Sequence, residues 1–279
     1  MKIKLLTAVA ALGVAGASQA AFADAPAPTP EFTIDGTAAV VSQYRFRGIS
    51  QSNNNPAFQG SITVTDKHGF YLSTWGSSTY DSNNYDPYDA STSPIGPGGT
   101  EIDVYGGWSH AYAKSGVTVD GGLYGYLYPN APANNYFEVY GDLSKSYGPV
   151  GAKIGLNWAP KQHYFTYFDT PTKYSMYEYF ELTFSPPKFS ALTVHGHIGH
   201  TGGGENYYTG EYMDYTAGVS YKWKALTFDV SAVGTNISKS KIINTGICDD
   251  GEGGVVGSCV DVFKRPVKSV AVVSVTASF

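Results

Sequence analysis

Two arginines stand two positions apart in the stretch SQYRFRGISQ, at Arg45 and Arg47. Residues two apart on a β-strand point to the same face, so both guanidinium groups would lie together. A positive pair at a channel mouth would select or orient anions, because Arg presents a planar fork of donors to carboxylate or phosphate. The same pair would also pin an outer loop by pairing with an acid such as Asp103. Both interpretations are open.

The pair His195-x-His197 has the same spacing, which brings two imidazoles within reach of one metal ion. His200 would point the other way, and no cysteine or third ligand follows at a suitable spacing. We therefore expect water-facing histidines without a metal or cofactor.

Acyl-transfer catalysis needs a nucleophile, a base and an orienting group within hydrogen-bond reach. The chain contains no G-x-S-x-G motif, and its histidines have only generic Asp and Ser neighbours. We expect no catalytic residues. A barrel enzyme remains an alternative. It would turn over ester or peptide substrates and would lose this activity when His195 or His197 is replaced.

Secondary structure must hold these side chains on one face, and the end of the chain indicates that this structure is a β-strand. In the last thirteen residues, VKSVAVVSVTASF, apolar Phe279, Val275 and Val273 alternate with polar Ser278 and Thr276. A period of two predicts a strand with one apolar and one wet face. A terminal Phe preceded by alternating apolar residues resembles the membrane-insertion signature that closes outer-membrane barrels.

The same alternation recurs along the chain and predicts twelve strands. They cover residues 33–47, 58–65, 70–75, 101–108, 117–127, 137–143, 150–158, 179–184, 192–198, 213–223, 226–232 and 267–279. Long connections (48–56, 77–100, 129–135, 159–173, 201–211, 235–266) alternate with short ones (66–69, 114–116, 146–149, 185–189, 223–225). This segregation by length is typical of an outer-membrane barrel and is not required in a soluble sandwich. The predicted fold is all-β, a transmembrane antiparallel up-and-down barrel whose termini both lie on the periplasmic side.

Charged side chains on the wet faces are the candidates to line a pore. They are Arg45, Arg47, Asp103, Asp120, Glu138, Lys153, Glu181, His195, His197, Asp214, Lys222 and Asp229. An excess of acids favours mild cation preference, while pairing between facing charges is expected to be their main use. Glu178 falls on the apolar face of its strand, which places it at the lipid headgroup level or marks a bulge.

The N-terminus indicates export. Lys2 and Lys4 precede an apolar stretch too short to span a bilayer, and Ala21-Phe22-Ala23 fits a cleavage site, so residues 1–23 are predicted to be a signal peptide. Residues 24–32 follow as a Pro/Ala linker, and the barrel takes residues 33–279. Cleavage removes two lysines and no acid, so the formal net charge moves from −5 to −7. A mildly acidic chain argues against nucleic acid as a partner.

Two cysteines, Cys248 and Cys259, stand in the longest outer connection, and an exported chain would join them in a disulfide. The loop between them holds several acids, among them Asp249 and Asp250. Their spacing does not match an EF-hand, so we expect a structural role for the loop.

The stretch from Ser42 to Gln51, followed by Asn-rich residues up to Pro56, resembles the N-terminal signature of the TorF family of putative porins. This resemblance implies a proteobacterial outer-membrane barrel and defines no substrate. We expect a monomeric barrel in outer-membrane lipid, inserted by the barrel assembly machinery, that passes small hydrophilic solutes or ions by diffusion. The alternative is a non-conducting barrel that presents its loops to partners.

Overall fold

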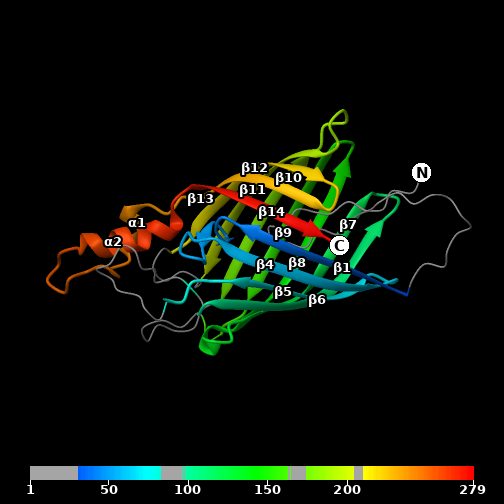
Figure 1. Cartoon of the computed structure of the whole chain (residues 1–279). Coiled ribbons are helices and arrows are strands. Elements are labelled where there is room, and N and C mark those ends of the chain that lie inside the picture. Colours follow the sequence, from blue (N-terminus) through cyan, green and yellow to red (C-terminus); the bar gives the residue numbers. More distant parts are fainter. Residues whose placement is uncertain (1–30, 83–95, 97, 163, 165–173, 204–209) are drawn as a thin grey trace, which may run out of the picture.

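The computed structural model describes residues 31–82, 96, 98–162, 164, 174–203 and 210–279. Within this part of the chain, twelve antiparallel strands close into one barrel, as the sequence predicted (Figure 1). The strands follow the order β1-β14-β13-β12-β11-β10-β9-β8-β7-β6-β5-β4, and β4 pairs with β1 to close the cylinder. The predicted signal peptide, and all but the last two residues of the linker, lie outside the described residues.

The wall strands are β1 (Phe32–Val41), β4 (Ala57–Asp66), β5 (Phe70–Ser78), β6 (Thr100–Tyr112), β7 (Val117–Leu127), β8 (Tyr136–Tyr147), β9 (Val150–Ala159), β10 (Ser175–Phe184), β11 (Leu192–Gly203), β12 (Tyr212–Trp223), β13 (Leu226–Thr235) and β14 (Val270–Ser278). Several extend past the predicted limits. For example, β10 begins at Ser175 rather than Tyr179, and β6 continues to Tyr112.

The barrel carries its apolar residues outside and its polar residues inside. On β13, Phe228 and Val230 are 41% and 56% exposed, whereas Thr227 and Ser231 are buried. A soluble protein does the reverse, because water penalises exposed apolar surface. The wall strands have 9 to 13 residues, close to the roughly 9–11 that a tilted strand needs to cross a bilayer. No helix among the described residues is long and apolar enough to cross a membrane.

The last residue completes the seam between the first and last strands. The backbone N–H of Gly36 donates to the Phe279 carbonyl at 2.8 Å, and the Phe279 N–H donates back at 3.0 Å. The Phe279 ring lies over Gly36, where an added Cβ would come within 2.4 Å of ring atom Cε2. Gly36 on β1 therefore leaves the space that the ring of Phe279 occupies.

The first strand is shorter than the alternation predicted. β1 ends at Val41, and the following residues leave the wall to form a hairpin of β2 (Arg45–Phe46) and β3 (Ile49–Ser50). At the turn of this hairpin, Arg47 and Gly48 have φ angles of 46° and 78°, a left-handed geometry that reverses the chain. The prediction that the strand runs on to Arg47 was wrong, because the backbone of Tyr44 bonds within the loop, to Ser52 Oγ and to the Gln51 N–H, and not to a wall strand. We call residues 42–56 the inner loop.

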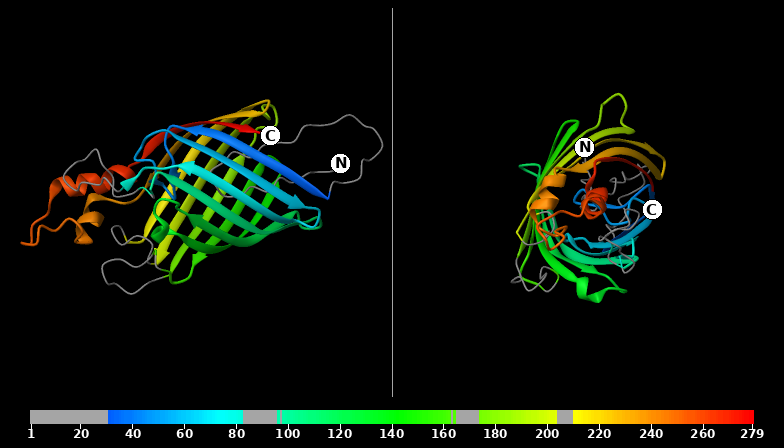
Figure 2. Two further views of the ribbon diagram at one scale, coloured as in Figure 1. Left: turned by 60° about the horizontal axis from the view of Figure 1, so that its bottom comes forward. Right: turned by 90° about the vertical axis from the view of Figure 1, so that its left-hand side faces the viewer.

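The last connection is partly helical, which its composition did not predict. It holds α1 (Lys239–Asn244), α2 (Gly257–Lys264) and the 3₁₀ turn η4 (Arg265–Val267) at one end of the barrel (Figure 1). Another 3₁₀ turn, η2 (Pro132–Asn134), lies in the β7–β8 connection. We call the end with α1 and α2 the outer end and the opposite one the inner end. Seen from the outer end, the helices lie in front of part of the opening (Figure 2).

The predicted disulfide between Cys248 and Cys259 is present and ties the start of α2 to the preceding turn. Both cysteines belong to a buried apolar cluster with Ile242, Phe263 and, from β3, Ile49. The inner loop and the last connection therefore pack against each other as one unit at the outer end.

Candidate functional site

The inner loop, residues 42–56, crosses the interior of the barrel in the half nearer to α1 and α2, which we call the outer half. At its tip, the Tyr212 hydroxyl donates to the Arg47 carbonyl at 3.1 Å. A Cβ added to Gly48 would lie 2.7 Å from Thr235 Cγ2 and 2.8 Å from Asp214 Cβ, so the tip touches β12 and β13. The loop leaves the wall at β1, and its tip lies against β13 and β12, two and three places from β1 around the barrel. One of its arginine side chains reaches the wall on the other side, at β8.

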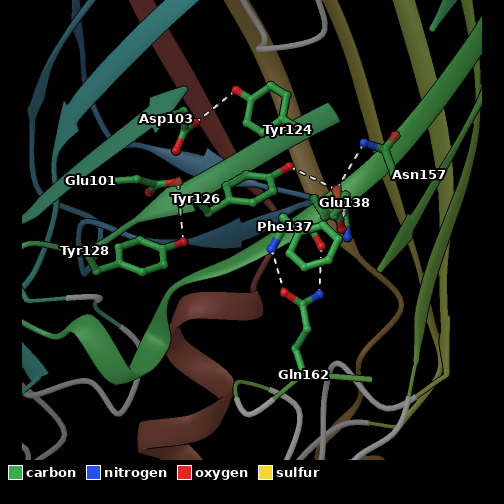
Figure 3. Close-up of polar contacts among 10 residues, drawn as sticks. Glu101, Asp103, Tyr124, Tyr126, Tyr128, Phe137, Glu138, Asn157 and Gln162 are labelled. Atoms are coloured by element: carbon green, nitrogen blue, oxygen red, sulfur yellow. Dashed lines mark hydrogen bonds and ion pairs between the residues drawn. The ribbon is translucent and has the colours of Figure 1, made fainter. Parts of the chain in front are cut away.

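That side chain is Arg47, which pairs with Glu138 on β8. Its Nη2 lies 2.8 Å from Oε1 and 2.7 Å from Oε2, and both side chains are almost fully buried. The Tyr126 hydroxyl and the Asn157 amide each donate to Glu138 Oε2 at 3.0 Å (Figure 3). A carboxylate can be buried at tolerable cost when it is paired and hydrogen-bonded in this way.

Aromatic rings enclose the Arg47 guanidinium. Its Cζ lies 4.7 Å from the Phe46 ring centre and 4.3 Å from that of Tyr177, within cation–π range. The Tyr177 hydroxyl donates to Asp214 Oδ1 at 3.2 Å and lies 2.7 Å from His197 Nε2. Tyr177 lies over Gly199, where an added Cβ would be 2.2 Å from its hydroxyl. Arg47 is thus held by charge, by ring faces and by the wall behind them.

Arg45 has a different role, because it donates hydrogen bonds to neutral oxygens. Nη1 donates to the carbonyls of Gly48 (2.9 Å), Pro266 (2.6 Å) and Lys268 (3.1 Å). Nε and Nη2 donate to the side-chain oxygens of Gln43 and Asn54, both at 2.8 Å. Burial lowers the pKa of Arg45 to about 10, so the group is still charged at neutral pH. Arg45 joins the inner loop to the last connection.

Stacked, buried tyrosines lie in the outer half. Tyr105 and Tyr124 stack with ring centres 4.5 Å apart, and Tyr126 stacks on Tyr136 at 4.3 Å. Two acids from β6, Glu101 and Asp103, lie among these rings and are buried (Figure 3). The outer half is therefore a packed region of aromatic and charged side chains.

The inner half holds three further ion pairs, of which the two histidine pairs are partly exposed and Lys153–Asp142 is buried. His195 Nε2 lies 2.6 Å from Asp229 Oδ2, His197 Nδ1 lies 3.2 Å from Glu181 Oε1, and Lys153 Nζ lies 3.1 Å from Asp142 Oδ2. The Glu181 and His195 side chains are 32% and 21% exposed, although they point inward. Water therefore reaches the wall below the inner loop.

The structure places the predicted pore-lining residues on the inside of the barrel, but not all in one place. Arg47, Glu138 and Asp214 meet at the inner loop with Asp103 nearby, and Arg45 lies at the loop's base. Lys153, Glu181, His195, His197 and Asp229 lie in the inner half. Asp120 accepts from the Tyr71 hydroxyl at 2.7 Å, and Lys222 follows the buried Ser220 on the same face of β12. Their role as pore-lining groups stays a prediction.

The two arginines do not form an open rim, because the inner loop carries them inside. The interpretation that they pin a loop describes their contacts, with Glu138 rather than Asp103 as the acid. Glu178 points away from the barrel interior, as its position in the alternation of its strand predicts, and its Oε2 lies 3.8 Å from His200 Nδ1. Within the described residues, no three His, Cys, Asp or Glu side chains are grouped to hold a metal ion.

Sequence reasoning missed the importance of Tyr126 and Tyr177. Neither residue is among the candidates to line a pore, because tyrosine suits a membrane interface as well as a pore wall. A usable signal was Gly199, a small residue among the polar positions of β11 that makes room for a large neighbour.

Comparisons with known proteins agree with this architecture. A family model described as "Bacterial protein of unknown function (Gcw_chp)" matches residues 24–263. A search of curated proteins found no match. Among solved structures, the NanC porin is similar over 88% of this chain and 99% of its own, with 11% identity and a TM-score of 0.51. The KdgM porin in complex with disordered oligogalacturonate is similar over 88% and 98%, with 11% identity and a TM-score of 0.50. At such identity the likeness shows the fold alone.

Proposed function

The chain belongs to the Gcw_chp family of bacterial proteins of unknown function and has a porin-like barrel, and we propose that it is an outer-membrane channel for small hydrophilic solutes. The resemblance of its inner loop to the TorF putative porins is part of this proposal. Export by a cleaved signal peptide, insertion by the barrel assembly machinery and a monomeric state belong to the same proposal.

One observation carries the proposal: the barrel has a polar interior that water enters from the inner end. Glu181 and His195 face inward in this water-reached space, with side chains that are 32% and 21% exposed. A barrel that served only as an anchor would have no need for charged groups there, since burying charge costs free energy. Ionisable side chains along a water-filled wall are the usual means of filtering solutes by charge.

The inner loop defines the narrowest level. Arg47 and Glu138 join the loop to β8, and Tyr126, Tyr177 and Phe46 surround their contact. Barrels of about eight strands are filled by side chains, and those of sixteen or more hold open water. A twelve-stranded barrel with an inward loop stands between these limits, so we propose a narrow conduit in which size selects first and charge second.

A non-conducting barrel is the second candidate, and the packing of the outer half favours it. Tyr124, Tyr126, Glu101 and Glu138 are all buried there. The two candidates differ in current across a planar lipid bilayer that contains the refolded mature chain. Steady, small unitary conductance supports the channel. Silence from protein shown to be folded by its heat-dependent gel mobility supports the closed barrel.

A further inference from the structure

Two carboxylates on β6 are buried next to each other in the outer half of the barrel. Glu101 and Asp103 are two positions apart, so both point inward, and each is only 2% exposed. Figure 3 shows the two side chains side by side, with Tyr124 and Tyr128 reaching toward them. Two negative groups in one enclosed space repel each other, and each loses the hydration that stabilises it in water.

The protein's own groups compensate this charge poorly. Glu101 Oε1 accepts from the hydroxyls of Tyr44 and Tyr128 at 3.3 and 3.5 Å, which are long and neutral contacts. Asp103 Oδ2 accepts from the Tyr124 hydroxyl at 2.9 Å. No N–H or O–H donor of the described residues reaches the other oxygen, Asp103 Oδ1, which is buried, and the Glu101 and Asp103 carboxyl groups can hydrogen-bond to each other only if one of them carries a proton. A buried acceptor in this position indicates a proton or a cation that the surrounding side chains do not supply.

No cationic side chain among the described residues forms an ion pair with either acid. Arg47, which pairs with Glu138, lies nearby, and Arg45 donates to carbonyl and amide oxygens. Lys153 and His197 serve other carboxylates in the barrel, Asp142, Glu181 and Asp214. The charge of Glu101 and Asp103 must therefore be neutralised by a proton or by a bound cation.

We propose that Glu101 and Asp103 bind a hard divalent cation of the calcium class. Every donor at the site is oxygen: two carboxylates supply two negative charges, and phenol oxygens of Tyr44 and Tyr128 lie within reach. Calcium accepts flexible all-oxygen coordination, whereas softer transition metals prefer nitrogen or sulfur. This site goes beyond the proposed channel function and does not depend on it.

The bound ion would hold separate segments together. Tyr44 belongs to the inner loop, Glu101 and Asp103 belong to β6, and Tyr128 follows β7. Tyr44 also packs on Trp75 of β5, with ring centres 5.3 Å apart. A ligand that binds only the folded state increases the free energy of unfolding as the ligand concentration rises. The ion would therefore stabilise the inner loop in its position inside the barrel.

Calcium binding to the folded full-length mature chain in detergent micelles tests the site. We expect saturable binding of calcium, competition by terbium with luminescence sensitised by the surrounding tyrosines and Trp75, and a thermal unfolding midpoint that is higher in calcium than in a chelator. The double variant Glu101→Gln/Asp103→Asn should bind at least about tenfold more weakly. Asp249→Asn/Asp250→Asn, in the exposed outer loop, is the control and should bind as the wild type does.

Three results would overturn the proposal. The first is a wild type that binds no calcium and unfolds at the same temperature in calcium and chelator. The second is a folded double variant that binds as well as the wild type, since the ion would then lie elsewhere. The third is a double variant more stable than the wild type in both buffers, which would mean that a shared proton neutralises the pair. If the double variant does not fold, calcium binding by the single variant Asp103→Asn replaces the second result. The unfolding temperature of the wild type in calcium and in a chelator then tests the proposal independently.

Discussion

The Arg47 guanidinium lies 2.7 Å from the Glu138 carboxylate, and this ion pair joins a loop that follows β1 to a strand on the far side of the barrel. The two residues are 91 positions apart in the chain. Because the pair is buried and enclosed by rings, it stabilises one position of the inner loop rather than an ensemble of positions.

Removing one member of this pair should destabilise the barrel strongly. Glu138→Gln leaves the Arg47 charge buried without its carboxylate, and the loss should be about 3–5 kcal/mol of the free energy of unfolding. Urea unfolding in lipid vesicles, followed by tryptophan fluorescence, measures it. Arg47→Met/Glu138→Gln should lose less than the two single variants together. A strictly additive loss would show that the two side chains are not coupled.

A methyl group on Gly199 should disturb the same site from the wall. Gly199→Ala places a Cβ where the Tyr177 hydroxyl lies, and such overpacking typically costs about 1–3 kcal/mol. Gly196→Ala is the matched control on β11, because its Cβ would meet nothing nearer than 3.8 Å. The same urea experiment should show a clear loss for the first variant and little for the second. Equal losses would mean that the strand itself, rather than Tyr177, is sensitive.

Reduction of the disulfide should loosen the last connection but not the barrel. The bond closes a loop with a sequence separation of 11, for which the chain-entropy model gives about 3 kcal/mol. Limited proteolysis of Cys248→Ser/Cys259→Ser should cut between α1 and α2 much faster than in the oxidised wild type, while the wall strands stay protected. Unchanged cleavage would show that the apolar cluster around Ile242 and Phe263 holds the helices without the bond.

Ion selectivity should follow the accessible charges of the inner half. Among the inward-facing charges of the inner half, Asp142, Glu181 and Asp229 outnumber the lysines Lys153 and Lys222, so reversal potentials in a salt gradient should indicate a mild preference for cations. Glu181→Gln should reduce the preference and Lys153→Gln should increase it. Shifts in the same direction for both variants would contradict a filter based on these charges.

The sequence was enough to predict the barrel, because lipid outside and water inside impose a period of two on every strand. Strand number, alternating loop lengths, the disulfide and the outward parity of Glu178 all follow from local pattern. The inner loop did not follow, since Arg45 and Arg47 continue the alternation of β1, although the wall strand ends at Val41. The hydrogen bonds that hold the loop inside come from within the loop and from Pro266, which is distant in the sequence. The helices α1 and α2 were missed because burial against Ile49, a distant residue, stabilises them.

The pairing partners were harder to predict than the faces. The alternation of faces along each strand predicts that Glu138 and His197 point into the barrel. It does not predict how far each residue lies from the barrel ends, or which strands face each other across the interior. Arg47 reaches Glu138 only because the barrel closes with β8 five places from β1 and because the loop folds inward. Such contacts depend on the closed geometry of the whole chain.

The central claim is that the inner loop, fixed by Arg47 and Glu138, narrows a conducting barrel. Single-channel recording of the refolded wild type beside a variant in which residues 43–54 are replaced by a short Gly/Ser linker tests it most directly. We predict small, steady conductance for the wild type and a severalfold larger conductance for the variant. A folded loop-replacement variant that stays silent, or that conducts no better than the wild type, would contradict the account.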